Sequence, residues 1–219
     1  MQTLRLFFCK TGDAKYLSHL DLNRCFARAL RRSGMDIWYT QGYNSRVYLL
    51  FALPLALGIE SFVENLDIKL NTPVVYTCVS ERINGYLPAG IEVFDHRVPV
   101  RKHSEIEAAR YLFDVRGGSD YIGALINAYN TLENLDGVIM EKPGKKRNQS
   151  IDIKKQIRHT KYTTIEDGIL IDAMLDSGSQ SYLNPHLLFR WLTKSAEGEP
   201  RSYRIIRTGV YVSNGENFE

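Results

Sequence analysis

The sequence of 219 residues predicts an α+β fold made of two consecutive halves. Segments with the alternating hydrophobicity of β-strands are interspersed with segments of helical period, which is typical of a mixed fold. The same order of segments occurs twice, and a polar stretch that follows a proline, residues 99–104, separates the two occurrences. The composition, with 44% hydrophobic and 24% charged residues, excludes the disordered, collagen-like and coiled-coil classes.

The first half opens with a strand, because hydrophobic residues alternate along residues 4–8. A helix follows, since Ser18 with an acid three residues later resembles a capping box and Gly34 is a typical stop. Thr72-Pro73 is expected to open a second helix. The expected order is a strand at 4–8, a helix at 18–34, extended segments at 36–41, 47–53 and 62–70, a helix at 72–86 and a strand at 91–98.

The second half repeats this order. Ser119 is expected to cap a helix with an apolar face, and Asn184-Pro185 to open another. The expected order is a strand at 108–115, a helix from 119, a strand at 138–142, an extended segment at 151–157, a strand at 168–175, a helix from 184 and a strand at 203–212. Each half therefore has the βαββαβ order of the split-βαβ or ferredoxin-like plan. The sequence predicts two tandem ferredoxin-like halves, residues 1–103 and 104–219.

The helix at 18–34 concentrates positive charge on one side. On a helical wheel Leu22, Phe26, Ala29 and Ser33 share one face, and the opposite sector holds four arginines and an acid. These are Arg24, Arg28, Arg31 and Arg32, with Asp21 among them. The planar guanidinium fork suits phosphate, so the stripe predicts contact with a nucleic-acid backbone or an acidic protein surface. The alternative is a solvated outer face with no partner.

A second basic cluster lies at residues 142–161, where eight Lys and Arg residues accompany a single acid, Asp152. Prolyl, glycyl and amide residues flank Lys145, Lys146 and Arg147, which predicts a basic loop tip able to contact phosphate. The alternative is a hairpin kept soluble by its lysines. Because the formal net charge is only +3, the rest of the chain is acidic, and a dipolar surface of this kind favours a binding role.

Further candidate site residues are isolated in the sequence. His19, predicted near Phe26 and Leu30 on the wheel, could be a general base or a ligand, or a half-buried packing residue. Asp152 could be an acid at a site or the partner of a neighbouring lysine. The other candidates are a ligand groove lined by Gln41, Gly42, Asn44 and Arg207, with Arg46 as a further contact to nucleic acid. For these the alternatives are a plain turn at 41–46 and an Arg207 on the exposed outer face.

The common motifs of nucleotide, hydrolase and metalloprotease sites do not occur in the sequence. Cys9, Cys25 and Cys78 have neither CxxC spacing nor flanking histidines, so we expect no metal and no cofactor, and no disulfide framework. No signal peptide or membrane span is evident. These features predict a cytoplasmic protein with no membrane partner and leave catalysis undecided, with an enzyme that acts alone disfavoured.

The sequence also resembles a known bacterial family. The stretches that carry the resemblance are Phe8-Cys9-Lys10-Thr11-Gly12, Tyr16-Leu17-Ser18-His19-Leu20-Asp21-Leu22, Arg28-Ala29-Leu30-Arg31-Arg32-Ser33-Gly34, Gln41-Gly42-Tyr43-Asn44, residues 51–61, Leu87-Pro88-Ala89-Gly90-Ile91, Ile151-Asp152-Ile153 and Arg207-Thr208-Gly209. Over nearly the whole chain they resemble the radical-SAM-linked protein family, a bacterial domain of unknown function. That family occurs beside or fused to radical-SAM proteins, often near a ribonuclease of the E/G type and ribosomal-protein genes. The resemblance implies a radical-SAM partner and a link to RNA.

Two departures limit what this resemblance implies. The family usually shows Pro-His-Pro after the asparagine, whereas this chain has Ser45-Arg46-Val47, so any role of that histidine is lost. The chain has no CxxxCxxC triad, so a radical-SAM cluster would belong to the partner. The leading hypothesis is an RNA-binding or accessory subunit of a radical-SAM system. The alternatives are an RNA-modifying or RNA-cleaving enzyme with a groove around His19, Asp21 and Arg46, and a protein-interaction adaptor.

Overall fold

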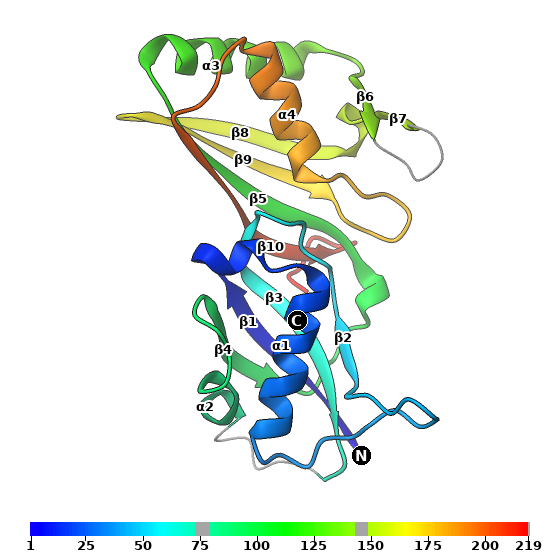
Figure 1. Cartoon of the computed structure of the whole chain (residues 1–219). Coiled ribbons are helices and arrows are strands. Elements are labelled where there is room, and N and C mark those ends of the chain that lie inside the picture. The colour runs from blue at the N-terminus through cyan, green and yellow to red at the C-terminus, as the bar shows by residue number, and fades with distance from the viewer. Residues whose placement is uncertain (73–78, 143–148, 219) are drawn as a thin grey trace. The chain divides into compact units, whose positions relative to one another are not determined.

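The computed structural model describes residues 1–72, 79–142 and 149–218, and the chain divides into two compact units (Figure 1). Unit 1 comprises Met1–Glu105 and Phe218, and unit 2 comprises Ile106–Asn217. Both units combine strands and helices, as an α+β fold requires. No helix in these described stretches is both long enough and apolar enough to cross a membrane.

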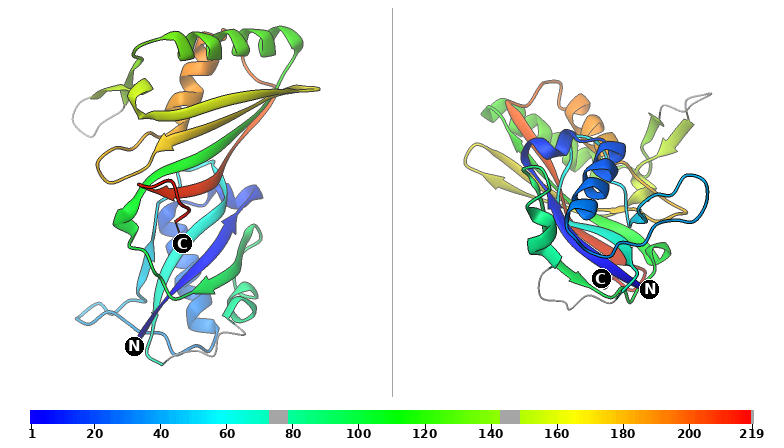
Figure 2. Two further views of the ribbon diagram at one scale, coloured as in Figure 1. Left: turned by 180° about the vertical axis from the view of Figure 1, so that it is seen from behind. Right: turned by 60° about the horizontal axis from the view of Figure 1, so that its bottom comes forward.

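Unit 1 has helices on one side of an antiparallel sheet. Its elements are β1 Gln2–Lys10, η1 Gly12–Tyr16, α1 His19–Arg32, β2 Leu49–Phe51, β3 Glu60–Leu70, α2 Val79–Asn84, β4 Ile91–Arg97 and η2 His103–Glu105. The strands pair in the order β4–β1–β3–β2, and each of these pairings is antiparallel. Seen from behind, the strands lie in front of α1 (Figure 2).

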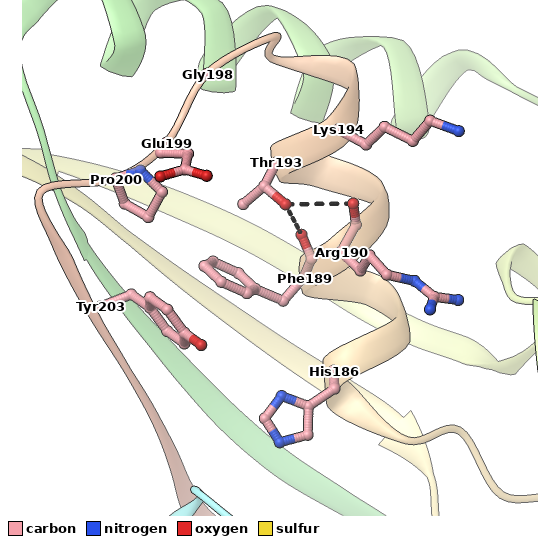
Figure 3. Close-up of a pocket in the computed structure, with 9 residues that line it drawn as sticks. All are labelled: His186, Phe189, Arg190, Thr193, Lys194, Gly198, Glu199, Pro200 and Tyr203. Atoms are coloured by element: carbon pink, nitrogen blue, oxygen red, sulfur yellow. Dashed lines mark hydrogen bonds between the residues drawn. The ribbon is translucent and has the colours of Figure 1, made fainter.

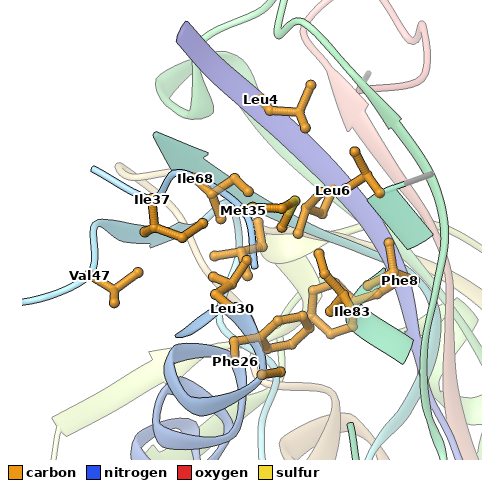
Figure 4. Packing of buried hydrophobic residues seen from close by; sticks show 14 of the residues in the cluster. Leu4, Leu6, Phe8, Phe26, Leu30, Met35, Ile37, Val47, Ile68 and Ile83 are labelled. Carbon is orange, nitrogen blue, oxygen red and sulfur yellow. The ribbon is translucent and has the colours of Figure 1, made fainter. Parts of the chain in front are cut away.

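The core of unit 1 lies between α1 and the sheet (Figure 4). Phe26 and Leu30 of α1 are fully buried, as the helical wheel predicts. The ring of Phe26 meets the ring of Phe8 on β1 edge to face, with the centroids 4.9 Å apart. Because strand side chains alternate, the residues of β1 and β3 that face α1 are apolar and the intervening ones point to the opposite face.

Capping at its two ends explains where α1 begins and ends. Ser18 is the N-cap: its Oγ accepts a hydrogen bond from Asp21 N at 3.1 Å and donates one to Asp21 Oδ2 at 2.7 Å. The helix ends at Arg32 with Ser33 as its C-cap, and Gly34 follows with φ +70°, a left-handed conformation that glycine adopts without strain. The capping signals in the sequence therefore locate both ends of this helix.

A buried ionic group lies on the face of the unit 1 sheet opposite α1. Arg5 of β1 and Asp67 of β3 are directly opposite each other, and Arg5 Nε and Nη2 donate to Asp67 Oδ1 and Oδ2 at 2.7 and 2.9 Å. His103 Nε2 lies 3.0 Å from Asp67 Oδ2, and the Arg5 guanidinium lies 4.5 Å from the ring centroid of Phe218. Arg5 is only 1% exposed. With the ring of Phe218, the group therefore joins four separate segments of unit 1.

Unit 2 has the same arrangement of strands with an added hairpin. Its elements are β5 Ile106–Arg116, α3 Ser119–Asn134, β6 Ile139–Lys142, β7 Gln149–Asp152, η3 Lys154–Gln156, β8 Ile157–Ile165, β9 Gly168–Asp176, α4 Pro185–Ser195 and β10 Ser202–Val212. The strands pair antiparallel in the order β10–β5–β9–β8, and β6 pairs separately with β7. Tyr129 of α3 contacts Tyr162 of β8, and Phe189 of α4 stacks on Phe113 of β5.

Two predicted segments differ from the structure. The extended segment predicted at 151–157 is the end of β7 followed by η3, and the strand β8 after it was missed. In the described chain β8 pairs with β9 alone, and exposed residues such as Arg158, His159 and Lys161 occupy most of it. Its hydrophobic alternation is therefore weak. Residues 36–41 form no strand, only isolated bridges at Ile37 and Tyr39.

The predicted start of one helix is wrong by one residue, and the predicted start of another lies outside the described residues. The N-cap of α3 is Gly118, and Ser119 is the first helical residue, so the predicted serine cap is wrong by one position. Within the described residues the helix predicted at 72–86 is the shorter α2. Its predicted start at Pro73 belongs to residues 73–78, outside the described residues.

Candidate nucleic-acid interface

The four arginines of α1 all lie on its solvent face. Arg24, Arg28, Arg31 and Arg32 are exposed, whereas the buried residues of the helix are Leu22, Phe26, Ala29 and Leu30. The sheet packing described above fixes this orientation, because rotating α1 would expose its aromatic and aliphatic side chains. We call the exposed side carrying these four residues the arginine face.

Most of the charge on the arginine face has no acidic partner. Arg24 Nη1 lies 3.2 Å from Asp21 Oδ1, and Arg28 Nε donates to the Arg24 carbonyl at 3.2 Å. The hydrogen bond from Ser18 and, less strongly, Arg24 lower the pKa of the Asp21 carboxyl, so it is ionised and balances one guanidinium. Among the described residues, no hydrogen bond or ion pair is made by the guanidinium of Arg31 or Arg32.

A hollow of about 400 Å³ adjoins the arginine face. Cys25, Arg28 and Arg32 line one side, and the segment that follows α2 lines the other with Gly85, Tyr86, Leu87 and Pro88. Tyr86 is 47% exposed. A cationic fork beside an accessible aromatic ring can hold a phosphate and an unstacked base together. Tyr86 was not among the predicted site residues, because the sequence placed it at the end of the helix expected at 72–86 and gave no sign of the hollow beside α1.

In the described chain, the residues predicted for a catalytic groove are not linked to one another by hydrogen bonds or ion pairs. His19 is exposed, so the expected half-buried position against Phe26 and Leu30 is wrong. Its ring instead meets Phe51 edge to face at 5.0 Å, and its Nε2 lies 3.1 Å from Asn23 Nδ2. In the part of the chain that the structure describes, no hydrogen bond or ion pair joins His19, Asp21 and Arg46 to one another.

The predicted ligand-groove residues occupy both units. Gln41, Gly42 and Asn44 of unit 1 are exposed, and in the same segment Arg46 N donates to Thr40 Oγ1 at 3.0 Å. Gly42 has φ +120°, a conformation that side chains disfavour, which is a reason for glycine in this turn.

Arg207, in unit 2, is 1% exposed, so the alternative of an arginine on the exposed outer face is wrong. Its Nε donates to Tyr111 Oη at 3.2 Å, and its guanidinium carbon lies 5.6 Å from the centroid of that ring.

Within the described residues, part of the second basic cluster is engaged in local structure. Asp152 Oδ1 accepts from Val138 N at 2.8 Å and from Lys154 N at 3.2 Å, and Oδ2 lies 3.8 Å from Lys155 Nζ. These contacts favour the structural interpretation of Asp152. Arg158 Nε lies 2.6 Å from Asp176 Oδ1. The predicted loop tip, Lys145, Lys146 and Arg147, lies outside the described residues.

Cys9 and Cys25 are free thiols, and Cys78 lies outside the described residues. Within the described ranges, no group of three or more His, Cys, Asp or Glu side chains is placed to hold a metal ion.

Comparisons with known proteins extend this description. A family model described as "Uncharacterized protein conserved in bacteria (DUF2344)" matches residues 3–185. No curated protein sequence matches the chain. Among solved structures, the fold is similar to a chain in the crystal structure of a Cbf5-Nop10-Gar1 complex, with a TM-score of 0.55 and 9% sequence identity. The match covers 94% of this chain and 48% of that one, so the likeness extends over about half of the solved chain.

Proposed function

The chain belongs to the family of uncharacterised proteins conserved in bacteria called DUF2344, and we propose that it is an RNA-binding accessory protein whose arginine face contacts the phosphates of single-stranded RNA. One observation carries the proposal: exposed guanidiniums without carboxylate partners adjoin a hollow that holds an accessible tyrosine. The guanidiniums would bind backbone phosphates, and Tyr86 would stack on a base.

The spacing of the arginines suits a nucleic-acid strand. Residues four apart on a helix are separated by about 6 Å along its axis, so Arg24, Arg28 and Arg32 form a regular row. Such a row can follow successive phosphates, whereas a single small anion would use only one or two of the guanidiniums. The tyrosine at the hollow favours a single strand, because bases that are stacked in a duplex are not free to stack on a protein side chain.

The proposal extends to the fold. We propose that the two halves of the sequence, residues 1–103 and 104–219, are each a ferredoxin-like βαββαβ module. In support, both units have their strands in the same antiparallel order, with the second-half hairpin β6–β7 as an insertion. Separate expression of the two segments tests this division: each should give a cooperatively folded product, and aggregation of both would contradict it.

The proposal also includes a partner. The resemblance to the radical-SAM-linked family is the reason to expect that the chain acts in the bacterial cytoplasm beside a radical-SAM protein, which would supply the iron–sulfur cluster. Purification of the native protein with its bound partners tests this part. Recovery of the chain without any protein that carries a CxxxCxxC cluster motif would contradict it.

Binding of a labelled single-stranded RNA at several salt concentrations tests the proposed function. If three arginines contact phosphates, the plot of log affinity against log salt should fall with a slope of about −2, because each neutralised phosphate releases a counterion. Fluorescence anisotropy with an RNA of mixed sequence measures this slope directly.

The controls are a duplex RNA and a single-stranded DNA of the same sequence. We expect the single-stranded RNA to bind more tightly than the duplex, and the single-stranded DNA to show how far binding depends on phosphate contact and stacking alone. Affinity that does not change with salt would contradict phosphate contact, and tighter binding of the duplex would contradict the stacking role of Tyr86.

A further inference from the structure

A second hollow lies in unit 2, between α4 and the segment that leads into β10 (Figure 3). Its volume is about 710 Å³, within the range of about 300–1,000 Å³ that is typical of small-molecule sites. Its lining includes Phe189 and Thr193 of α4, Glu199 and Pro200 of the segment after α4, and Tyr203 near the start of β10. None of these residues was a candidate in the sequence analysis.

An aromatic ring forms one wall of this pocket. Tyr203 is 48% exposed, and its ring centroid lies 4.4 Å from that of the buried Phe189. Phe189 in turn stacks on Phe113 of β5, with an interplanar angle of 19°. The two inner rings therefore hold Tyr203 in place and leave part of its surface open to a ligand. A ring that is already ordered loses little conformational entropy when a ligand stacks on it.

The positive charges of the pocket lining are directed away from this wall. Figure 3 shows Glu199 and Tyr203 on one side of α4, and the charged ends of Arg190 and Lys194 on the other side. Arg190 Nη2 donates to the Glu141 carbonyl at 3.0 Å. Lys194 lies in the last turn of α4, where a cation complements the partial negative charge of a helix C-terminus. A ligand that lies against Tyr203 therefore meets neither of these charges.

Two polar groups of the pocket, on Thr193 and Glu199, are hydrogen-bond acceptors. Thr193 Oγ1 donates to the carbonyls of Phe189 and Arg190 at 3.1 and 3.2 Å, so its one hydrogen is used and its oxygen can only accept. Within the described chain, the Glu199 carboxylate makes no side-chain hydrogen bond or ion pair. A ligand that donates hydrogen bonds and carries positive charge would therefore complement this pocket.

The chain after α4 fixes the position of Glu199. Glu197 has φ +50°, a left-handed conformation that residues other than glycine rarely adopt, and it turns the chain directly after the helix. A Cβ atom on Gly198 would lie 2.9 Å from Tyr121 Cδ2, so this segment packs closely on α3. Pro200 then restricts the backbone on the other side of Glu199. The carboxylate is thus carried by a constrained segment, which lowers the cost of ordering it around a ligand.

We propose that this pocket binds a guanidinium group, with its flat face on Tyr203 and its N–H edge on the Glu199 carboxylate. A guanidinium is planar, stacks on aromatic rings and donates two parallel hydrogen bonds to a carboxylate, so it satisfies both groups together. Free arginine and the arginine side chain of a peptide carry this same group. The site does not involve the arginine face, so the proposal goes beyond the proposed function.

Other ligand classes meet only part of these requirements. A lysine ammonium would pair with Glu199 but has no flat face to lie on Tyr203. The neutral urea group of citrulline has the shape of a guanidinium but leaves the charge of Glu199 without compensation. An anion would be repelled by Glu199, and the two cations of the lining are turned away from it.

Titration of the isotope-labelled full chain with arginine, followed through its amide chemical shifts, tests the proposal. We expect saturable shifts centred on residues 198–203, with citrulline at least about tenfold weaker, since one lost hydrogen bond between charged groups is of that order. Lysine should also bind more weakly than arginine. A Gly-Arg-Gly peptide with blocked ends identifies the source of the group: tighter binding than free arginine supports a protein partner, and weaker binding supports a small molecule.

Matched variants locate the site. Glu199→Gln should weaken arginine about tenfold and leave citrulline unchanged, because only the charged ligand loses an ion pair. Glu197→Gln makes the same change in charge at a residue that does not line the pocket, and it should retain the affinity for arginine. Tyr203→Ala should weaken both ligands through lost stacking, while Tyr203→Phe should retain binding.

Thermal unfolding of each variant shows whether it is folded. The proposal is overturned if arginine does not bind, if citrulline binds as tightly as arginine, or if folded Glu199→Gln binds arginine as well as the wild type. Inorganic phosphate that shifts the same amide signals at a lower concentration than arginine would also overturn it, because the pocket would then be an anion site.

Discussion

Replacing Arg28 and Arg31 together with glutamate is expected to weaken the binding of single-stranded RNA by about 100-fold or more at low salt. Each substitution removes a guanidinium from the arginine face and places a carboxylate where a phosphate would lie. Arg28 also lines the hollow beside Tyr86, so its reversal acts on both elements of the proposed interface. Anisotropy titration against the wild type measures the loss.

The control must carry the same change in net charge at another place. Lys102 and Arg201 are exposed residues outside α1, and reversing both to glutamate alters the total charge by the same amount. This control is expected to retain most of the affinity, because a long-range effect of total charge is weaker than a lost contact. Equal losses in the two double variants would contradict a localised interface on α1.

Asp67→Asn is expected to lower the free energy of unfolding by about 3 kcal/mol at neutral pH, because removing one partner of a buried ion pair leaves the other charge without compensation. Arg5 is 1% exposed and donates two hydrogen bonds to this carboxylate. Denaturant unfolding followed by circular dichroism gives the difference. Asp95→Asn is the matched control: its pair with Arg97 is exposed and should contribute less than about 1 kcal/mol.

The effect of Asp67→Asn should also depend on pH. Burial alone would raise the pKa of Asp67, but the hydrogen bonds and charges of Arg5 and then His103 outweigh it, so the folded pKa lies below the ordinary value of 3.8. A carboxyl whose folded pKa is lowered stabilises the protein above its unfolded pKa, and this stabilisation is lost as pH falls through the folded pKa. The variant and the wild type should therefore converge in strong acid. A difference in unfolding free energy between the two proteins that stays constant into strong acid would contradict the role of the carboxylate.

The sequence predicted those parts of the fold that local signals determine. The cap at Ser18 and the stop at Gly34 locate α1, because both act through backbone geometry within a few residues. The strand β8 lacked such a signal, since exposed polar residues occupy most of it. The pairing of Arg5 with Asp67 was beyond sequence reasoning, because it depends on the register between β1 and β3.

The candidate site was predictable in part for the same reason. The arginine face follows from spacing along one helix, which the sequence displays directly. The hollow beside it requires Tyr86 from another element, and the pocket on α4 requires Glu199 and Tyr203 from beyond that helix. A local sequence pattern does not show which residues of separate elements lie close together in the fold. His19 was placed wrongly because a wheel describes one helix and does not include a neighbour such as Phe51.

Protection of Cys25 against alkylation tests the arginine-face proposal most directly in the unmodified protein. The Cys25 thiol lies in the hollow with Arg28 and Arg32, and Cys9, on β1, provides an internal reference. Peptide mass spectrometry after brief alkylation gives the rate at each cysteine with and without saturating single-stranded RNA. The proposal predicts that RNA slows the modification of Cys25 several-fold and leaves Cys9 unchanged. An unchanged rate at Cys25 while RNA is bound would contradict it.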